Sequence, residues 1–302
     1  MAMKKAPKKI PFMKLSGAGN DFIVVDNRNR AVDPGKMSAF VTSVCTRHLS
    51  VGADGLIFIE KAPKAHFRWR FYNNDGGKAD FCGNGARCVA RFAYLKRIAP
   101  KKMRFEGTAG VVEAMVDGES VTVRVPDPTG LRLNIRLDIP PTRRRNTGQA
   151  APSQPSHMGM TLEGHAINTG VPHFVYFVHD TSTAEVIGLG RQIRRHPAFK
   201  PAGTNVDFIE VVDRRTIRVR TYERGVEDET LACGSGAIAA ALIAAVVHKV
   251  ESPVTVVPLS RSPLTVSFRV DGPRFTTIAL TGEARMVCEG SMPANAWEYT
   301  LQ

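Results

Sequence analysis

Short apolar runs bounded by turn residues recur along the chain and predict β-strands. The first covers residues 22–25, after a glycine-rich segment at 16–20, and similar runs lie at 56–59, 121–123, 174–178 and 217–219. Their brevity and their content of Val, Ile and Phe fit strands better than amphipathic helices. We therefore expect a fold built largely from short strands.

Two longer segments, at residues 86–95 and 237–247, predict helices instead. The second is an alanine-rich run of eleven apolar residues, so we expect a helix buried on all sides. It is too short to cross a bilayer core of about 30 Å. Many strands with a few helices indicate the α+β class.

The composition is that of an ordinary folded protein except for its high positive charge. The chain has 302 residues, 43% of them hydrophobic, which is enough for one large domain or two ordinary ones. The formal net charge is +13, which favours an anionic partner: nucleic acid, a membrane surface or an acidic substrate. The basic clusters at residues 4–9, 143–145 and 191–195 contain no interleaved aromatics, so solvated surface charge is the simpler interpretation.

Five cysteines occur, Cys45, Cys82, Cys88, Cys233 and Cys288, and no two have the spacing of a zinc or redox motif. Their odd number and low density predict neither a disulfide framework nor a metal site. No apolar segment follows the basic residues 1–12, so we expect no secretory signal and a reducing, cytoplasmic setting.

The two halves of the chain resemble each other. The segment Cys82-Gly83-Asn84-Gly85-Ala86 recurs half a chain length later as Cys233-Gly234-Ser235-Gly236-Ala237. Residues 20–23 have an echo at 205–209, and 71–73 have one at 221–223. Three echoes in the same order predict an internal duplication, with one such turn in each α+β domain.

A cysteine and two glycines that lead into a helix suit acid–base chemistry. Glycine permits a tight turn, and the free N–H groups and dipole of the helix start attract a carboxylate. We expect the same position to lower the pKa of the thiol. One motif alone would more simply be structural, but two facing motifs allow one sulfur to remove a proton while the other delivers one to the opposite face. Cys45, Cys88 and Cys288 are expected to pack in the core.

These residues resemble the diaminopimelate epimerase family. The resemblance extends from Phe12 to Gly290, with landmarks at residues 17–22, 52–55, 73–76, 82–88, 172–173, 222–225 and 229–236. It implies conversion of L,L-2,6-diaminoheptanedioate to the meso isomer, for lysine and peptidoglycan synthesis, without pyridoxal phosphate, another cofactor or a metal. It also implies two pseudo-symmetric domains, each a curled, mostly antiparallel sheet around a central helix, with the active site between them, and a homodimer.

The resemblance sets the expected domain boundaries. The N-terminal domain would span residues 12–130 plus 279–302 and contain Cys82, and the C-terminal domain would span 131–278 and contain Cys233. Residues 1–11 would form a basic extension. Residues 139–160, rich in Pro, Arg, Ser and Gln, predict a mobile loop.

The family also implies a role for each matching residue. Cys82 and Cys233 match the acid–base thiols, and Glu223 and His173 match groups that assist the reacting centre. The helix-start anion sites are matched by Gly83, Asn84, Gly234 and Ser235. The substrate contacts are matched by Asn20, Asn73, Asn205 and Arg224, of which Arg224 suits a bidentate grip on the distal carboxylate.

Two departures from the family leave the substrate open. Val171 stands before Pro172 where asparagine is common, and Gly55 follows Asp54 where a larger polar residue is common. A related two-cysteine racemase for another amino acid is therefore an alternative, although Arg224 favours a dicarboxylate. A nucleic-acid or surface-binding protein is the third hypothesis, from the charge alone, since the sequence contains no phosphate loop and no dinucleotide fingerprint.

Overall fold

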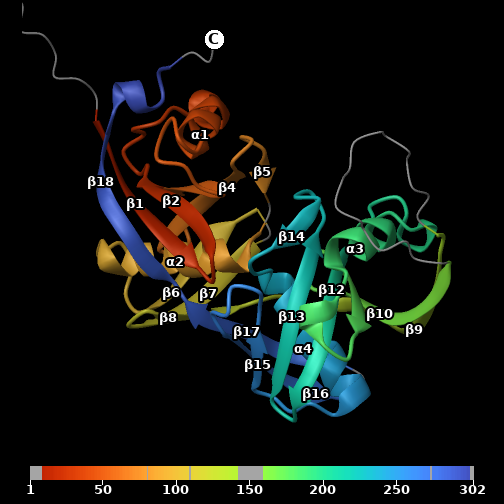
Figure 1. Cartoon of the computed structure of the whole chain (residues 1–302). Coiled ribbons are helices and arrows are strands. Elements are labelled where there is room, and N and C mark those ends of the chain that lie inside the picture. The colour runs from red at the N-terminus through yellow and green to blue at the C-terminus, as the bar shows by residue number, and fades with distance from the viewer. Residues whose placement is uncertain (1–8, 80, 109, 142–158, 273, 300–302) are drawn as a thin grey trace, which may run out of the picture. The chain divides into compact units, whose positions relative to one another are not determined.

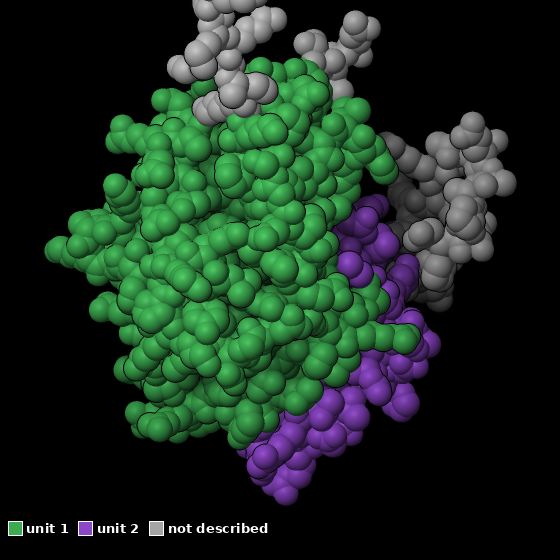
Figure 2. Space-filling view, turned by 90° about the vertical axis from the view of Figure 1, so that its left-hand side faces the viewer, with its two compact units in different colours: residues 1–127, 252–302 green, residues 128–251 purple. Residues whose placement is uncertain are grey.

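The chain divides into two compact units. The computed structural model describes residues 9–79, 81–108, 110–141, 159–272 and 274–299 (Figure 1). Unit 1 comprises residues 1–127 and 252–302, and unit 2 comprises residues 128–251 (Figure 2).

Unit 1 is built from a long sheet and two α-helices. Its strands are β1 (Lys9–Gly17), β2 (Asn20–Asp26), β3 (Gly55–Glu60), β4 (Phe67–Asn73), β5 (Lys78–Ala79), β6 (Lys102–Gly107), β7 (Gly110–Asp117), β8 (Ser120–Arg124), β15 (Val254–Val257), β16 (Leu264–Asp271), β17 (Arg274–Glu283) and β18 (Arg285–Pro293). Its helices are α1 (Met37–Cys45) and α2 (Gly83–Leu95), with 3-10 turns η1 (Pro34–Lys36) and η4 (Ala294–Ala296).

The sheet of unit 1 curls around α2. Its strands pair in the order β18–β1–β2–β3–β4–β6–β7–β8–β17–β16–β15, and only β2–β3 and β4–β6 are parallel among these pairs. Helix α2 packs against β1 and β2 and also against β8 and β17, which lie far along this order. Helix α1 packs on β3 and β4, so β3 is covered on both faces and is buried along nearly its whole length.

Unit 2 repeats this plan on a smaller scale. Its strands are β9 (Thr129–Ile139), β10 (Met160–Asn168), β11 (Pro172–Phe177), β12 (Asn205–Asp213), β13 (Thr216–Glu223) and β14 (Asp228–Thr230), and its helices are α3 (Val186–Arg194) and α4 (Gly234–His248), with η2 (Thr181–Thr183) and η3 (Pro197–Phe199). The strands that the structure describes in this unit pair in chain order, and only β11–β12 is parallel among them. Helix α4 packs against β10 to β13, and α3 packs against β9, β12, β13 and β14.

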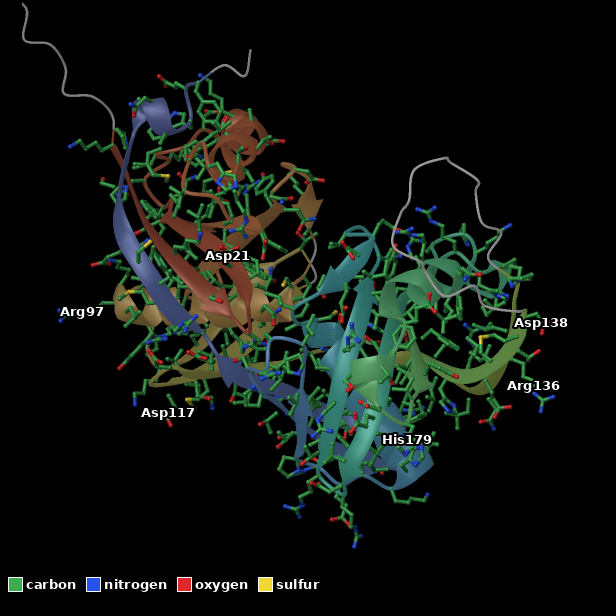
Figure 3. All side chains as sticks on the ribbon, viewed as in Figure 1. Asp21, Arg97, Asp117, Arg136, Asp138 and His179 are labelled. Carbon is green, nitrogen blue, oxygen red and sulfur yellow. The ribbon has the colours of Figure 1, made fainter. Side chains whose placement is uncertain are left out.

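Burial follows the predicted patterns. Ten residues of α4 are buried, as its uniform apolarity predicts. Strand β9 instead alternates near its end: Leu137 and Ile139 enter the core, while Arg136 and Asp138 point to solvent (Figure 3). The α+β class and the two sheet-and-helix units are confirmed.

Some boundaries differ from the expected ones. Residues 252–278, expected in the second domain, cluster with unit 1 because β17 pairs with β8 and β16 pairs with β17. Residues 9–11, expected in the basic extension, begin β1, since Ile10 is buried and lies opposite Met292. The rest of that extension, residues 1–8, and residues 142–158 of the expected loop lie outside the described residues.

The strand pairing defines which positions of the two units correspond. In each unit a hairpin is followed by a helix, a strand parallel to the second strand of the hairpin, an antiparallel strand, a short strand and the central helix. Phe22 lies opposite Gly55, and His173 lies opposite Asn205, so β12 corresponds to β3. The expected match of residues 20–23 to 205–209 is therefore wrong, because these segments occupy β2 and β12. The match of 71–73 to 221–223 is confirmed.

Within the part of the chain that the structure describes, no helix is both long enough and apolar enough to span a membrane.

Shortening a core side chain of α4 should destabilise the fold. Leu242 is fully buried, so Leu242→Ala should lower the free energy of unfolding by about 2–5 kcal/mol through lost burial and a residual cavity. Val247, on the same helix, is 37% exposed, and Val247→Ala should change the free energy of unfolding by about 0.5 kcal/mol or less. Urea denaturation followed by circular dichroism measures both, and equal losses would contradict the central position of α4.

Candidate active site

Cys82 and Cys233 each cap the central helix of their unit. Both have extended backbone conformations, with φ −145° and ψ 119° for Cys82 and φ −111° and ψ 114° for Cys233. Each sulfur accepts a hydrogen bond from the N–H three residues on, Gly85 and Gly236, at 3.4 Å. The predicted helix starts are confirmed. Gly83 and Asn84, and Gly234 and Ser235, form the first turns, the part of a helix whose backbone N–H groups and dipole attract an anion.

In unit 1 the fold brings Asn20 and Asn84 to Cys82. The side-chain oxygen of Asn20 lies 3.8 Å from the Cys82 sulfur and accepts a bond of 3.4 Å from Asn84 Nδ2. Its nitrogen donates to Asp54 Oδ2 at 2.7 Å, so the orientation of the amide is defined on both sides. Asn20 lies at the start of β2, next to the tight turn at Ala18 and Gly19, where both residues have positive φ.

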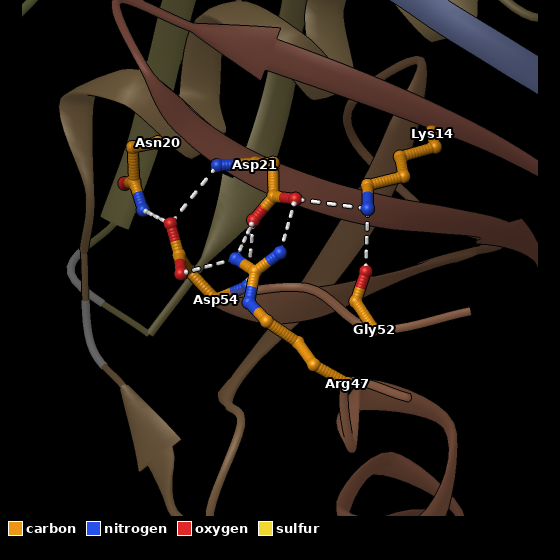
Figure 4. Close-up of polar contacts among 6 residues, drawn as sticks. All are labelled: Lys14, Asn20, Asp21, Arg47, Gly52 and Asp54. Atoms are coloured by element: carbon orange, nitrogen blue, oxygen red, sulfur yellow. Dashed lines mark hydrogen bonds and ion pairs between the residues drawn. The ribbon is translucent and has the colours of Figure 1, made fainter. Parts of the chain in front are cut away.

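A charged network behind Asn20 holds it in place (Figure 4). Arg47 bonds Asp21 and Asp54 with Nη2 at 2.9 Å each, and Lys14 pairs with Asp21 at 2.9 Å. Burial raises the pKa of the Asp21 carboxyl, but hydrogen bonds from Lys14 and Arg47 outweigh it and hold that pKa below its usual value. Sequence reasoning did not assign a role to Asp21, Arg47 or Lys14, because nothing in their local patterns shows that they meet.

Beneath the first turn of α2 lies a buried cation. Arg87 is fully buried and donates to Asn84 Oδ1 at 2.9 Å and to the Gly83 carbonyl at 3.3 Å. Burial lowers the pKa of its guanidinium, which the neighbouring thiols of Cys88 and Cys82 partly offset. Arg87 therefore fixes the turn that follows Cys82 and places positive charge near this sulfur.

In unit 2 a chain of buried polar groups leads to Cys233. Asp207 Oδ2 lies 2.7 Å from His173 Nδ1, and His173 Nε2 lies 2.9 Å from Ser235 Oγ. Ser235 Oγ in turn lies 3.4 Å from the Cys233 sulfur, and Thr221 donates to Asp207 Oδ1 at 2.7 Å. Sequence reasoning singled out His173 and Ser235 but missed Asp207, for which the only signal is a charged residue in a buried strand.

Asn205 extends this group toward Arg224. Its nitrogen lies 3.3 Å from His173 Nε2, and its oxygen accepts the Arg224 backbone N–H at 2.7 Å. The Arg224 guanidinium reaches the Ala202 carbonyl at 3.3 Å, and no ion pair involves it within the described residues. Its charge is thus available for a ligand. Asn73, at the exposed end of β4, occupies the position that corresponds to Glu223.

The expectation of a lowered thiol pKa is wrong for Cys233. Burial raises its pKa well above the usual value, and the carboxylates of Glu223 and Asp207 raise it further. Hydrogen bonds from Ser235 and Gly236 lower it only in part. The helix start does act on the sulfur, but two nearby negative charges and the loss of solvent outweigh it.

The other cysteines divide into two kinds. Cys45 and Cys88 are buried, as predicted, and burial raises the pKa of each thiol to about 12. Cys288 is exposed on β18, so its prediction as a core residue is wrong. Among the described residues no group of three or more His, Cys, Asp or Glu side chains could hold a metal ion.

Packing between strands explains why position 55 is a glycine. A Cβ at this position would come within 2.7 Å of the Tyr72 carbonyl oxygen and 2.8 Å of the Phe71 ring. Glycine is therefore required by the close approach of β4 to β3. Of the two departures that suggested another amino-acid substrate, only Val171 remains unexplained by packing.

Comparison with known proteins finds matches that cover most of the chain. The sequence model of the family described as diaminopimelate epimerase matches residues 12–129 and 165–287. The diaminopimelate epimerase of Aquifex aeolicus is 41% identical over 304 residues, covering 95% of this chain and 99% of that protein. The enzyme of the same name from Hydrogenobaculum sp. is 45% identical over 237 residues, covering 75% of this chain and 79% of that protein. Among solved structures, a Bacillus anthracis phenazine biosynthesis protein of the PhzF family has the same fold, with a TM-score of 0.67 at 15% identity over 94% of this chain and 99% of its own.

Removing one carboxylate near Cys233 should make its thiol more reactive. Glu223→Gln removes a negative charge that raises the pKa of Cys233, so alkylation of that residue by iodoacetamide at neutral pH should be about three- to tenfold faster. Glu229→Gln is the matched control, because Glu229 on β14 is bound by Arg220 at 2.6 Å through both oxygens. Mass spectrometry of the Cys233 peptide gives the rate, and a slower reaction in Glu223→Gln would contradict this electrostatic account.

Proposed function

The chain belongs to the diaminopimelate epimerase family, and on this premise we propose that it epimerises L,L-2,6-diaminoheptanedioate to the meso isomer. The observation on which the proposal rests is the duplicated cap: a cysteine at the start of the central helix in both units of one chain. Two acid–base groups that act on opposite faces of one carbon suit a reaction that inverts it. The product would serve lysine and peptidoglycan synthesis.

The proposed chemistry uses only proton transfers. One thiolate takes the α-proton, the electron pair of the broken C–H bond remains on the α-carbon, and the other thiol gives its proton to the opposite face. The sulfur that began as a thiol ends as a thiolate, so atoms and charge balance without an oxidant or a cofactor. Backbone N–H groups at the two helix starts would bind the α-carboxylate and stabilise the charge that develops.

We assign supporting roles by position. Asn20 and Asn84, which contact each other beside Cys82, would bind the reacting end of the substrate, together with Asn73, Gly83, Gly234 and Ser235. Asn205 and Arg224 would bind the distal end, where the Arg224 guanidinium, which forms no ion pair with any residue the structure describes, suits a second carboxylate. Glu223 and His173 would orient the substrate amine and act on the thiols.

We also propose that the enzyme works in a reducing, cytoplasmic setting and as a homodimer. None of the five cysteines, all of which the structure describes, forms a disulfide, and the mechanism needs both catalytic thiols reduced. Strand β18 favours the dimer, because it pairs only with β1 among the described strands and is exposed at eight of its nine residues. Its apolar side chains Met286 and Val287 are 43% and 52% exposed, as an edge that pairs with a second copy would be.

Loss of either proposed catalytic thiol should abolish epimerisation. Cys82→Ala and Cys233→Ala should each lower kcat for L,L-diaminopimelate by about 10²–10⁴-fold, because one proton-transfer group is lost. Cys88→Ala should keep near-normal activity, since the corresponding position of α4 is Ala239. Incubation in D₂O measures both deuterium uptake at the α-carbon and formation of the meso isomer.

Each outcome of this assay has a distinct meaning. Normal activity in either catalytic variant would overturn the two-thiol mechanism. No deuterium uptake by the folded, reduced wild-type protein would overturn diaminopimelate as substrate and direct attention to other amino acids, with Val171 as the first residue to test.

A charge on β18 should disrupt the proposed dimer. Val287→Lys would place an ammonium group in an apolar interface, so the species of twice the 32.9 kDa chain mass should dissociate to monomers. Val270→Lys is the control, at a position of β16 that is 64% exposed. Light scattering after gel filtration gives the mass, and a Val287→Lys protein that stays dimeric would exclude this strand as the interface.

A further inference from the structure

The core of unit 2 contains a fully buried carboxylate, Asp207. It lies on β12, where its oxygens bind only Thr221 and His173 among the described side chains. Burying a carboxylate destabilises a fold unless hydrogen bonds satisfy its oxygens. The glycine at position 236 leaves room for this carboxylate, because a Cβ there would collide with Asp207 Oδ1.

The corresponding positions of unit 1 show what the same scaffold accepts without this group. By strand pairing, Asp207 corresponds to Ile57, His173 to Phe22, and Thr221 to Phe71. All three unit 1 residues are apolar and buried, and Ile57 packs against Gly85 just as Asp207 packs against Gly236. The polar side chains Asp207, His173 and Thr221 therefore distinguish unit 2 from unit 1, where the same three positions are apolar.

Asp207 determines which group donates and which accepts in the series of hydrogen bonds that runs from Asp207 to Cys233. A carboxylate can only accept, so His173 donates from Nδ1, and its other nitrogen is the acceptor that faces the Ser235 hydroxyl at 2.9 Å. The Ser235 oxygen then faces the Cys233 thiol at 3.4 Å as an acceptor. In this arrangement the Cys233 thiol donates to Ser235, and the Ser235 hydroxyl donates to His173.

We propose that Asp207 is a positioning residue that aligns a proton relay from Cys233 through Ser235 to His173. In one step the Cys233 proton passes to Ser235 Oγ while the hydroxyl proton of Ser235 passes to His173 Nε2. The products are a Cys233 thiolate and an imidazolium whose charge Asp207 balances, so no other reactant is needed. This inference rests on the proposed function, in which each turnover exchanges the protonation states of the two thiols and Cys233 must be returned to its starting state.

The surroundings of Cys233 explain why such a relay is useful. Asp207 on β12 and Glu223 on β13 place negative charge near the sulfur, and His173 on β11 is the group that can accept its proton. Without the relay the thiolate would form next to two carboxylates, whose effect the start of α4 offsets only in part. With it, the proton moves only to the buried imidazole, next to Asp207.

The sign of one measurement separates the relay from a simple charge effect. If Asp207 acts only through space, Asp207→Asn removes a negative charge and Cys233 should react faster with iodoacetamide at neutral pH. If Asp207 aligns the relay, the asparagine amide donates to His173 Nδ1, moves the ring proton to Nε2 and removes the acceptor. Alkylation of Cys233 should then be about tenfold slower. A faster or unchanged rate overturns the proposal.

Glu210→Gln is the matched control for this substitution. Glu210 lies on the same strand and accepts bonds from Thr181 and Arg218, away from the relay, so its amide variant should leave Cys233 alkylation unchanged. In the full-length protein, Asp207→Asn should also lower kcat for L,L-diaminopimelate at least tenfold with little change in KM. A fall in stability with normal kcat would identify Asp207 as merely structural.

A measurement on the wild-type protein does not depend on how the variant folds. In ¹⁵N-histidine-labelled protein, His173 should show the proton on Nδ1, with its signal identified by loss in His173→Gln. A proton on Nε2 instead would overturn the relay. If the wild-type protein fails to epimerise diaminopimelate but Asp207→Asn still slows Cys233 alkylation, the relay stands and only the substrate assignment fails.

Discussion

The bond between each cysteine sulfur and the N–H three residues on is the interaction on which both half-sites depend. It satisfies one of the N–H groups at the start of a helix that forms the centre of its unit. It also holds the sulfur at the positive end of the helix dipole. A reactive group is thus positioned by the element that forms the centre of its unit, so its place does not depend on a surface loop.

The two half-sites share this geometry but differ in charge. In unit 1 a buried cation, Arg87, underlies the capped turn, whereas the corresponding position of α4 is Ile238. In unit 2 the buried ion is a carboxylate, Asp207, whereas unit 1 has Ile57. The two units therefore share a scaffold, but a buried charge of opposite sign lies at a different place beside each cysteine. Because burial strengthens electrostatic interactions, Arg87 and Asp207 give the two thiols different environments.

The supporting residues show how far a site extends beyond its reactive atoms. Asn20 presents its oxygen to Cys82 because Asp54 binds its nitrogen, and Asp54 is held in turn by Arg47. Asn205 is oriented by the backbone of Arg224, the residue proposed to bind the distal carboxylate. In both units the groups closest to the sulfur are oriented by a second layer of polar contacts, which leaves them little freedom to rotate.

The sequence by itself determined the class of fold, the duplication, the two helix starts and the two cysteines, because these depend on local patterns. Apolar periodicity, glycine turns and a repeated motif can be recognised without knowing what packs against them. It also identified His173, Asn205, Arg224 and Ser235, through motifs that family resemblance places near the cysteines.

Only the tertiary structure decided which groups act on each sulfur and in which direction. The pKa of Cys233 is raised first by burial and then by Glu223 and Asp207, which strands β13 and β12 bring to it, and no local pattern at the helix start contains that information. Strand register corrected the match of residues 20–23 to 205–209 and placed residues 252–278 with unit 1. Desolvation, charge proximity and register are properties of what surrounds a residue, and that is decided by the packing of the whole unit.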